Sequence, residues 1–271
     1  MRFRKAQTIA FILLLAVGQA FAQDDSAEKT GDATATPSPT PELTGTQLEG
    51  TRVAEASVLV YSQFTGRVRM NQIRKTTVEY GTIELTDAEG KKTKATYEKR
   101  MLRGDSLDKT KIRIDQSFPD ARYSLVYDGE KIFGVFGTTV FDPRADAKAS
   151  FSHSIWHGLD ALLRYYENGS KINFEKDEKI MGVDYRIITS LDKQGRKTTF
   201  YISKKSYRVM MLEYEEAGVK YRRKFYDYNY AQNTLVPYRT VLWANGKRVE
   251  EKRTSTVTFG QEVGEEYFDF S

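Results

Sequence analysis

The chain has 271 residues, with 42 lysines and arginines, 37 aspartates and glutamates, two histidines and no cysteine. Without cysteine, disulfide frameworks, zinc–cysteine sites, iron–sulfur clusters and thiol nucleophiles are excluded. Three of the basic residues fall within the first five positions, so the rest of the chain is close to neutral. This balance gives no support to nucleic-acid binding.

The start of the chain has the three zones of a secretory signal peptide. Basic residues at positions 2–5 precede the apolar run 9–17, and Ala20-Phe21-Ala22 provides the small-x-small pattern of a cleavage site. The apolar run is shorter than the roughly 20 residues that span a bilayer. We therefore expect a signal peptide over residues 1–22 and a periplasmic or secreted protein that starts at Gln23, without a transmembrane segment.

Residues 23–50 have a different composition from the rest of the chain. They contain three of the six prolines, in the stretch 37–41, together with many threonines and acidic residues and few apolar side chains. Such a segment buries too little apolar surface to offset the entropy lost on ordering. We predict a disordered Thr/Pro-rich tether over 23–50, followed by a single domain over 51–271.

Apolar residues in the domain recur mainly with a period of two, which is typical of β-strands. In Thr76–Thr86 the apolar parity changes at Gly81-Thr82, which predicts a β-bulge in this strand. Hairpin turns are indicated at Glu89-Gly90, Asp128-Gly129, Gln194-Gly195, Ala217-Gly218 and Asn245-Gly246. Long strands joined by hairpins predict one large curved antiparallel sheet rather than a sandwich of short strands.

Two segments have a helical period instead. Residues 151–168 place Ile155, Leu159, Leu162 and Leu163 on one face, and residues 51–63 show a weaker stripe. Helices on one face of an antiparallel sheet form an α+β fold.

Chemical motifs are few. His153 and His157 lie four residues apart and could share a metal on a helix, but no third ligand or catalytic glutamate accompanies them. Both histidines are expected on a solvated helix face, opposite the apolar stripe. The chain has no nucleophile elbow, phosphate loop or dinucleotide fingerprint, so we predict no catalytic residue, no metal and no cofactor.

The strand around 208–216 is apolar on both faces, so it must be covered twice or line a cavity. Alternation predicts a contiguous apolar patch on two neighbouring strands, formed by Phe200 and Ile202 with Met210, Leu212 and Tyr214. This patch is either closed core beneath the long helix or the lining of a ligand cavity. It is the predicted ligand-binding site.

The C-terminal half resembles exported LolA-like proteins. The resemblance lies in the rhythm of Gly182–Ile188, Thr199–Ser203, Arg208–Met210, Phe225–Tyr228 and Val236–Val241. That superfamily includes the periplasmic lipoprotein carrier and outer-membrane lipoprotein-sorting proteins. The resemblance implies a half-open antiparallel barrel, closed by helices, that shelters acyl chains.

The resulting expectation is an exported, non-enzymatic carrier of an apolar ligand, such as a lipid or the acyl chains of a lipoprotein. An envelope protein is a possible partner. Two alternatives remain open: an envelope scaffold without a ligand, whose interior is filled by side chains, and a hydrolase of unrecognised type, in which acids or histidines converge. An outer-membrane barrel is disfavoured because residues 221–225 place charge on both strand faces.

Overall fold

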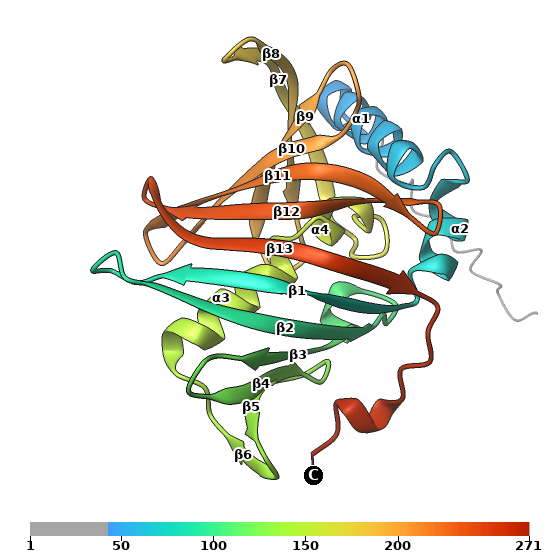
Figure 1. Ribbon diagram of the computed structural model, residues 1–271. Coiled ribbons are helices and arrows are strands. Elements are labelled where there is room, and N and C mark those ends of the chain that lie inside the picture. The colour runs from blue at the N-terminus through green and yellow to red at the C-terminus, as the bar shows by residue number, and fades with distance from the viewer. Residues whose placement is uncertain (1–42, 271) are drawn as a thin grey trace, which may run out of the picture. The chain divides into compact units, whose positions relative to one another are not determined.

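One antiparallel sheet of thirteen strands organises the computed structural model, which describes residues 43–270 (Figure 1). The strands are β1 (Thr76–Thr86), β2 (Lys92–Leu102), β3 (Lys111–Ser117), β4 (Arg122–Tyr127), β5 (Ile132–Phe136), β6 (Thr139–Phe141), β7 (Lys171–Ile180), β8 (Val183–Leu191), β9 (Lys197–Ser203), β10 (Val209–Glu216), β11 (Val219–Ala231), β12 (Thr234–Ala244) and β13 (Lys247–Phe259).

The strand order is β6-β5-β4-β3-β2-β1-β13-β12-β11-β10-β9-β8-β7. The first six strands and the last seven therefore form two up-and-down meanders, which meet where β1 pairs with β13. Because the order ends at β6 and β7, the sheet curves without closing. This α+β half-barrel is the fold that the sequence predicted.

Each of the five predicted glycine turns joins neighbouring strands of the sheet. In Ala217-Gly218 and Asn245-Gly246 both residues have positive φ, as two-residue hairpins require. The local sequence thus determines the hairpin positions directly.

The bulge predicted in β1 lies in its partner strand instead. Pairing of β1 with β2 is continuous, whereas on β13 the residue Ser255 is extra, between the partners of Tyr80 and Gly81. The apolar Val78 faces away from the interior of the half-barrel and is covered by the C-terminal segment, where it packs with Phe268. That cover explains why β1 has apolar residues of both parities without a bulge of its own.

The helices are α1 (Gly45–Tyr61), α2 (Gly66–Ile73), α3 (Ala145–Trp156) and α4 (Asp160–Leu163), with short 3-10 turns at Leu107–Lys109 and Glu265–Tyr267. Helix α1 begins at a capping box, in which the Thr44 side chain accepts from the Gln47 amide and the Gln47 side chain accepts from the Thr44 amide. Residues 45–50, predicted as the end of the tether, are therefore helical. The signal peptide and residues 23–42 of the predicted tether lie outside the described residues.

The helix predicted over 151–168 is shorter and divided. It begins six residues earlier, at Ala145, and ends at Trp156, after which the chain turns inward through His157. Helix α4 then buries Leu162 and Leu163 beneath α1. The helical spacing of apolar residues continues across this break because α3 and α4 both bury apolar side chains in the interior of the half-barrel.

The two largest clusters of buried side chains on the inner face of the sheet lie beneath helices. The larger is covered by α1 and α4 and includes Ile188, Phe200 and Leu212 on β8–β10. The smaller lies between α3 and β2–β5 and includes Ile112 and Phe151. Figure 1 shows α3 and α4 on the inner side of the sheet.

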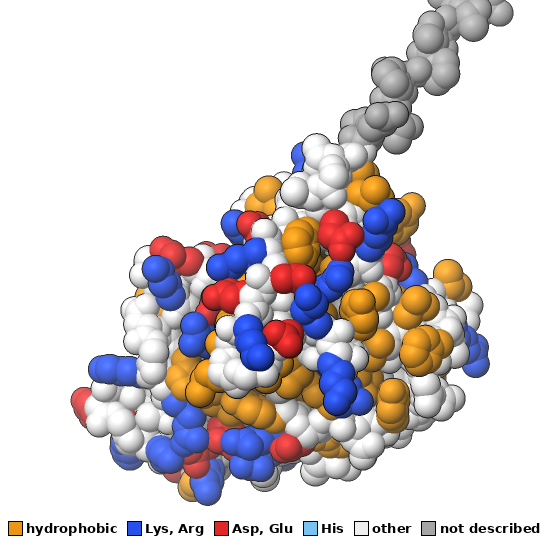
Figure 2. Space-filling view, turned by 90° about the horizontal axis from the view of Figure 1, so that it is seen from above, with side chains coloured by type: hydrophobic (Ala, Val, Ile, Leu, Met, Phe, Trp, Pro, Cys, Tyr) orange, Lys and Arg blue, Asp and Glu red, His pale blue; other side chains and the backbone are white. Residues whose placement is uncertain are grey.

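The face of the molecule seen in Figure 2 has positive and negative side chains intermixed, with apolar side chains between them. No patch of a single sign dominates that face, although residues 51–271 hold 38 basic and 31 acidic residues.

Candidate functional site

A cavity of about 1160 Å³ lies between α3 and the inner faces of β1–β4 and β11–β13. Its volume exceeds the range of about 300–1,000 Å³ that is usual for small-molecule sites. The apolar part of its wall includes Met101, Ile112, Ile114, Leu125, Phe151 and Ile155. These side chains come from β2, β3, β4 and α3, so the cavity is built by the curvature of the sheet and the one helix across it.

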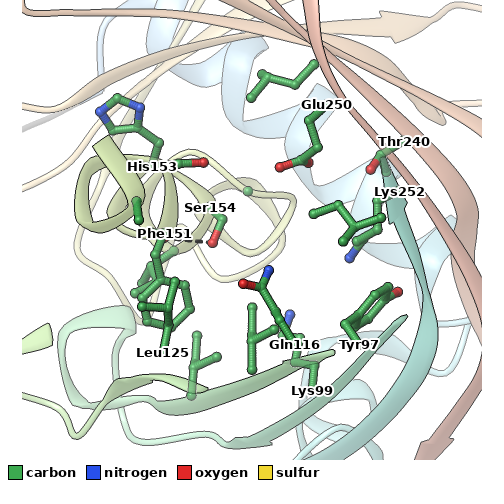
Figure 3. Close-up of a pocket in the computed structure, with 18 of the residues that line it drawn as sticks. Tyr97, Lys99, Gln116, Leu125, Phe151, His153, Ser154, Thr240, Glu250 and Lys252 are labelled. Carbon is green, nitrogen blue, oxygen red and sulfur yellow. Dashed lines mark hydrogen bonds between the residues drawn. The ribbon is translucent and has the colours of Figure 1, made fainter. Parts of the chain in front are cut away.

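Strand alternation decides which residues reach this cavity. On β2 the odd-numbered Tyr97, Lys99 and Met101 line it, and Figure 3 shows Tyr97 and Lys99 among its polar side chains. On β13 both Lys252 and Val257 line the cavity although their parities differ. The extra residue Ser255 between them makes this possible.

A buried carboxylate joins β1, β2 and β13 at the cavity wall. Glu79 accepts hydrogen bonds from Lys252 Nζ at 2.8 Å, from the Tyr97 hydroxyl at 2.6 Å and from the Thr254 hydroxyl at 3.1 Å. Burial by itself would raise the pKa of Glu79, but attraction to Lys252 and Lys99 and these hydrogen bonds lower the pKa to about 2. Glu79 is therefore ionised, and its Oε1 accepts all three of these hydrogen bonds.

A second carboxylate lies at the start of α4. Asp160 forms an ion pair with Arg103 at 2.6 Å and lies 3.9 Å from Arg74. Burial opposes ionisation of Asp160, yet the charges of Arg103, Arg74 and Arg164 hold its pKa well below the usual range. The Asp160 carboxylate thus also interacts with neighbouring cations of the protein.

Lys99 differs from these groups because its amine makes no hydrogen bond or ion pair with any described residue. Burial lowers the pKa of Lys99, and the charges of Glu79 and Asp160 only partly oppose that effect. Its side chain borders the cavity near the closed end, which α4 and Arg74 help to form. The opposite end is open, where Phe136 is 61% exposed and Lys91 and Asp87 are also exposed.

The structure corrects the prediction for His157, which is buried rather than solvated. Its Nδ1 shares a hydrogen bond with the Thr198 hydroxyl at 2.7 Å and its Nε2 with Glu216 at 3.1 Å, and the ring stacks on Tyr214. The prediction failed because α3 ends at Trp156, so His157 no longer follows the helical face. His153 stays on α3, half-buried, and lines the cavity.

The His157 arrangement brings together an acid, a histidine and a hydroxyl, as a hydrolase would need. Thr198 and His157 are both almost fully buried, and neither lines one of the cavities found in the described part of the chain. No cluster of three or more potential metal ligands occurs among residues 43–270. The geometry of these residues therefore provides a structural contact between the α3–α4 connection and the sheet.

The predicted apolar patch comes together only in part, and it lies outside the cavity. Phe200, Ile202, Leu212 and Tyr214 are buried in the core beneath α1 and α4, with Leu212 opposite Phe200 as expected. Met210 is half-buried at a bulge in β10 and is outside that cluster, because Val209 takes its place opposite Ile202. None of the five lines the cavity.

Sequence reasoning missed the cavity residues of β1–β4. Charged residues among the side chains that face inward could have indicated them. Lys99 lies between the inward-facing Tyr97 and Met101 on β2, and Glu79 faces inward on β1, as Ile83 does. Inward charges in a strand are costly unless they serve a partner or a ligand.

No helix in the described residues is long and apolar enough to cross a membrane.

Neither a scan against protein-family models nor a search of curated proteins found a match. Several solved structures are similar. A LolA superfamily protein from Nitrosomonas europaea is 10% identical, with a TM-score of 0.57 over 81% of this chain and 97% of its own. A DUF1329 family protein from Desulfovibrio piger is 12% identical, with a TM-score of 0.54 over 80% and 97%.

A third structure, described as an outer membrane lipoprotein-sorting protein domain from Vibrio parahaemolyticus, is 14% identical with a TM-score of 0.52. It aligns over 82% of this chain and 97% of its own. At these identities the likeness concerns the fold. The curved open sheet, the helices on its inner face and these similarities show that the chain has a LolA-like fold.

Proposed function

We propose that this protein is an exported, non-enzymatic carrier that shelters an apolar ligand, the acyl chain of a lipid or lipoprotein, in the cavity between α3 and the sheet. The observation that carries the proposal is the cavity itself, about 1160 Å³ in volume with an apolar wall and one open end. The signal-peptide pattern supports a periplasmic or secreted location. The lipoprotein-sorting domain with a similar fold supports the same class of cargo.

An acyl chain gains free energy by leaving water for such a wall. Each buried methylene contributes about 0.8 kcal/mol, so a long chain overcomes the entropy lost on binding. A scaffold without a ligand would fill this space with side chains, as the core beneath α1 does. The open cavity therefore favours the carrier over the scaffold.

The first test is native mass spectrometry of the protein purified from its own envelope, in which we expect a retained lipid. The second is binding of a fluorescent fatty acid to Ile114→Trp, whose new ring would occupy the cavity. Affinity should fall by about tenfold or more, or roughly 1.4 kcal/mol. Thr82→Trp is the matched control, because Thr82 is exposed on a neighbouring part of the sheet and does not line the cavity.

The outcome that contradicts the carrier function is equal affinity of Ile114→Trp and Thr82→Trp, or no binding by the unaltered protein. A circular dichroism melt of each variant separates loss of binding from loss of fold.

A further inference from the structure

Lys99 is the starting point, because its amine makes no hydrogen bond or ion pair with any residue between 43 and 270. In the sheet it lies directly opposite Glu79 on β1 and Ile114 on β3. The three hydrogen bonds that Glu79 accepts, from Lys252, Tyr97 and Thr254, all end on its Oε1. The Lys99 amine borders the cavity and makes no hydrogen bond to any described residue.

The charges around Lys99 do not neutralise its positive charge. Five cations, Lys99, Lys252, Arg74, Arg103 and Arg164, act on the two carboxylates of Glu79 and Asp160. Glu250, a further acid on the cavity wall, lies across the cavity from Lys99 in Figure 3. The closed end of the cavity thus has an excess of positive charge.

An unpaired ammonium in a largely apolar wall costs free energy unless an anion joins it. We propose that the ligand is a single-chain amphiphile with an anionic head group, and that Lys99 binds this head group at the closed end of the cavity. This inference rests on the proposed carrier function and adds the chemical class of the ligand. The lowered pKa of Lys99, caused by burial, is the shift that such an anion would reverse.

The dimensions of the cavity suit a chain in this orientation. Along β2, Thr93 near the open end is six residues from Lys99, or about 20 Å. One acyl chain accounts for half of a bilayer core of about 30 Å. With its head group at Lys99, the chain would pass the side chains of Ile83, Leu85 and Tyr123 toward the mouth.

Carboxylates and phosphate monoesters share the chemistry that Lys99 requires, so the experiment compares both with a neutral analogue. Palmitate, hexadecyl phosphate and 1-hexadecanol are titrated at pH 7.5 against a neutral apolar dye bound to the full mature chain. We expect either or both anions to displace the dye at a concentration about tenfold lower than the alcohol does. A preference for only one anion identifies the source of the head group.

Three variants assign the preference to Lys99. Lys99→Met should bind the alcohol as before and lose the preference for anions, whereas Lys99→Arg should keep it. Lys94→Met is the matched control, since Lys94 is on the same strand, exposed, and does not line the cavity.

The possible results are distinguishable. Equal affinity for anions and alcohol in the unaltered protein, or an anion preference that survives in Lys99→Met, overturns the role of Lys99 while leaving the carrier intact. Failure of the dye and of all three compounds to bind contradicts the carrier function itself.

Discussion

His157, in the connection between α3 and α4, shows how one side chain couples stability to pH. Burial, only partly opposed by the hydrogen bond and charge of Glu216, lowers the pKa of His157 from 6.5 to about 4. As the pH falls, the unfolded chain therefore binds a proton before the folded protein does. The contribution to stability is complete above about pH 6.5 and is lost as the pH falls toward 4, by about 3 kcal/mol in total.

We predict that His157→Gln flattens this dependence. Urea unfolding at several pH values between 4 and 7 should show a steep fall in the free energy of unfolding for the unaltered protein and a shallow one for the variant. His153→Gln is the comparison: burial also lowers the pKa of His153, but less than that of His157, so this variant should flatten the slope less. An unchanged slope in His157→Gln would show that this histidine does not carry the pH dependence.

Leu212 tests whether the predicted patch is closed core. Its side chain is 0% exposed beneath α1 and α4. An arginine there would be buried without a partner, at a cost of several kcal/mol, so Leu212→Arg should unfold the domain. Leu85→Arg, at the cavity wall near the mouth, should remain folded by circular dichroism. A folded Leu212→Arg that melts near the unaltered protein would contradict the assignment.

Among the elements, the C-terminal segment closes the outer face of the sheet. Phe268 is 1% exposed and packs with Val78, Val126 and Phe133. Phe268→Ala should lower the free energy of unfolding by about 3–5 kcal/mol, as is usual for deletion of a buried aromatic ring. Phe136→Ala is the comparison, since that ring is largely exposed and should change stability little. Equal effects in a thermal melt would mean that the segment is not docked in solution.

Local chemistry made most of the elements predictable from the sequence. Glycine turns such as Asn245-Gly246 and the alternation in Thr76–Thr86 depend on a few neighbouring residues. The bulge was misplaced because Val78 is covered by Phe268, nearly two hundred residues later in the chain. The end of α3 was missed because His157 is held by Thr198 on a distant strand. Periodicity cannot reveal contacts of that kind.

At the scale of the whole molecule, the sequence predicted the half-barrel but not which part of it is hollow. Phe200 and Leu212 have the same apolar pattern as Ile112 and Leu125, and only the placement of α1, α3 and α4 decides which set lines the cavity. Inward-facing charged residues such as Lys99 are local features of the sequence that indicate where the cavity lies.

The pairing of β1 with β13 has a consequence for the order of events during synthesis. Thr77 on β1 pairs with Phe259 on β13. Strand β13, which carries Lys252 in the cavity wall, is the last strand in the sequence and is therefore synthesised after all the others. Pairings between such distant segments form slowly, after local hairpins. A nascent chain has its first hairpins but no enclosed interior. An interior that could enclose a ligand therefore exists only after β13 has paired with β1.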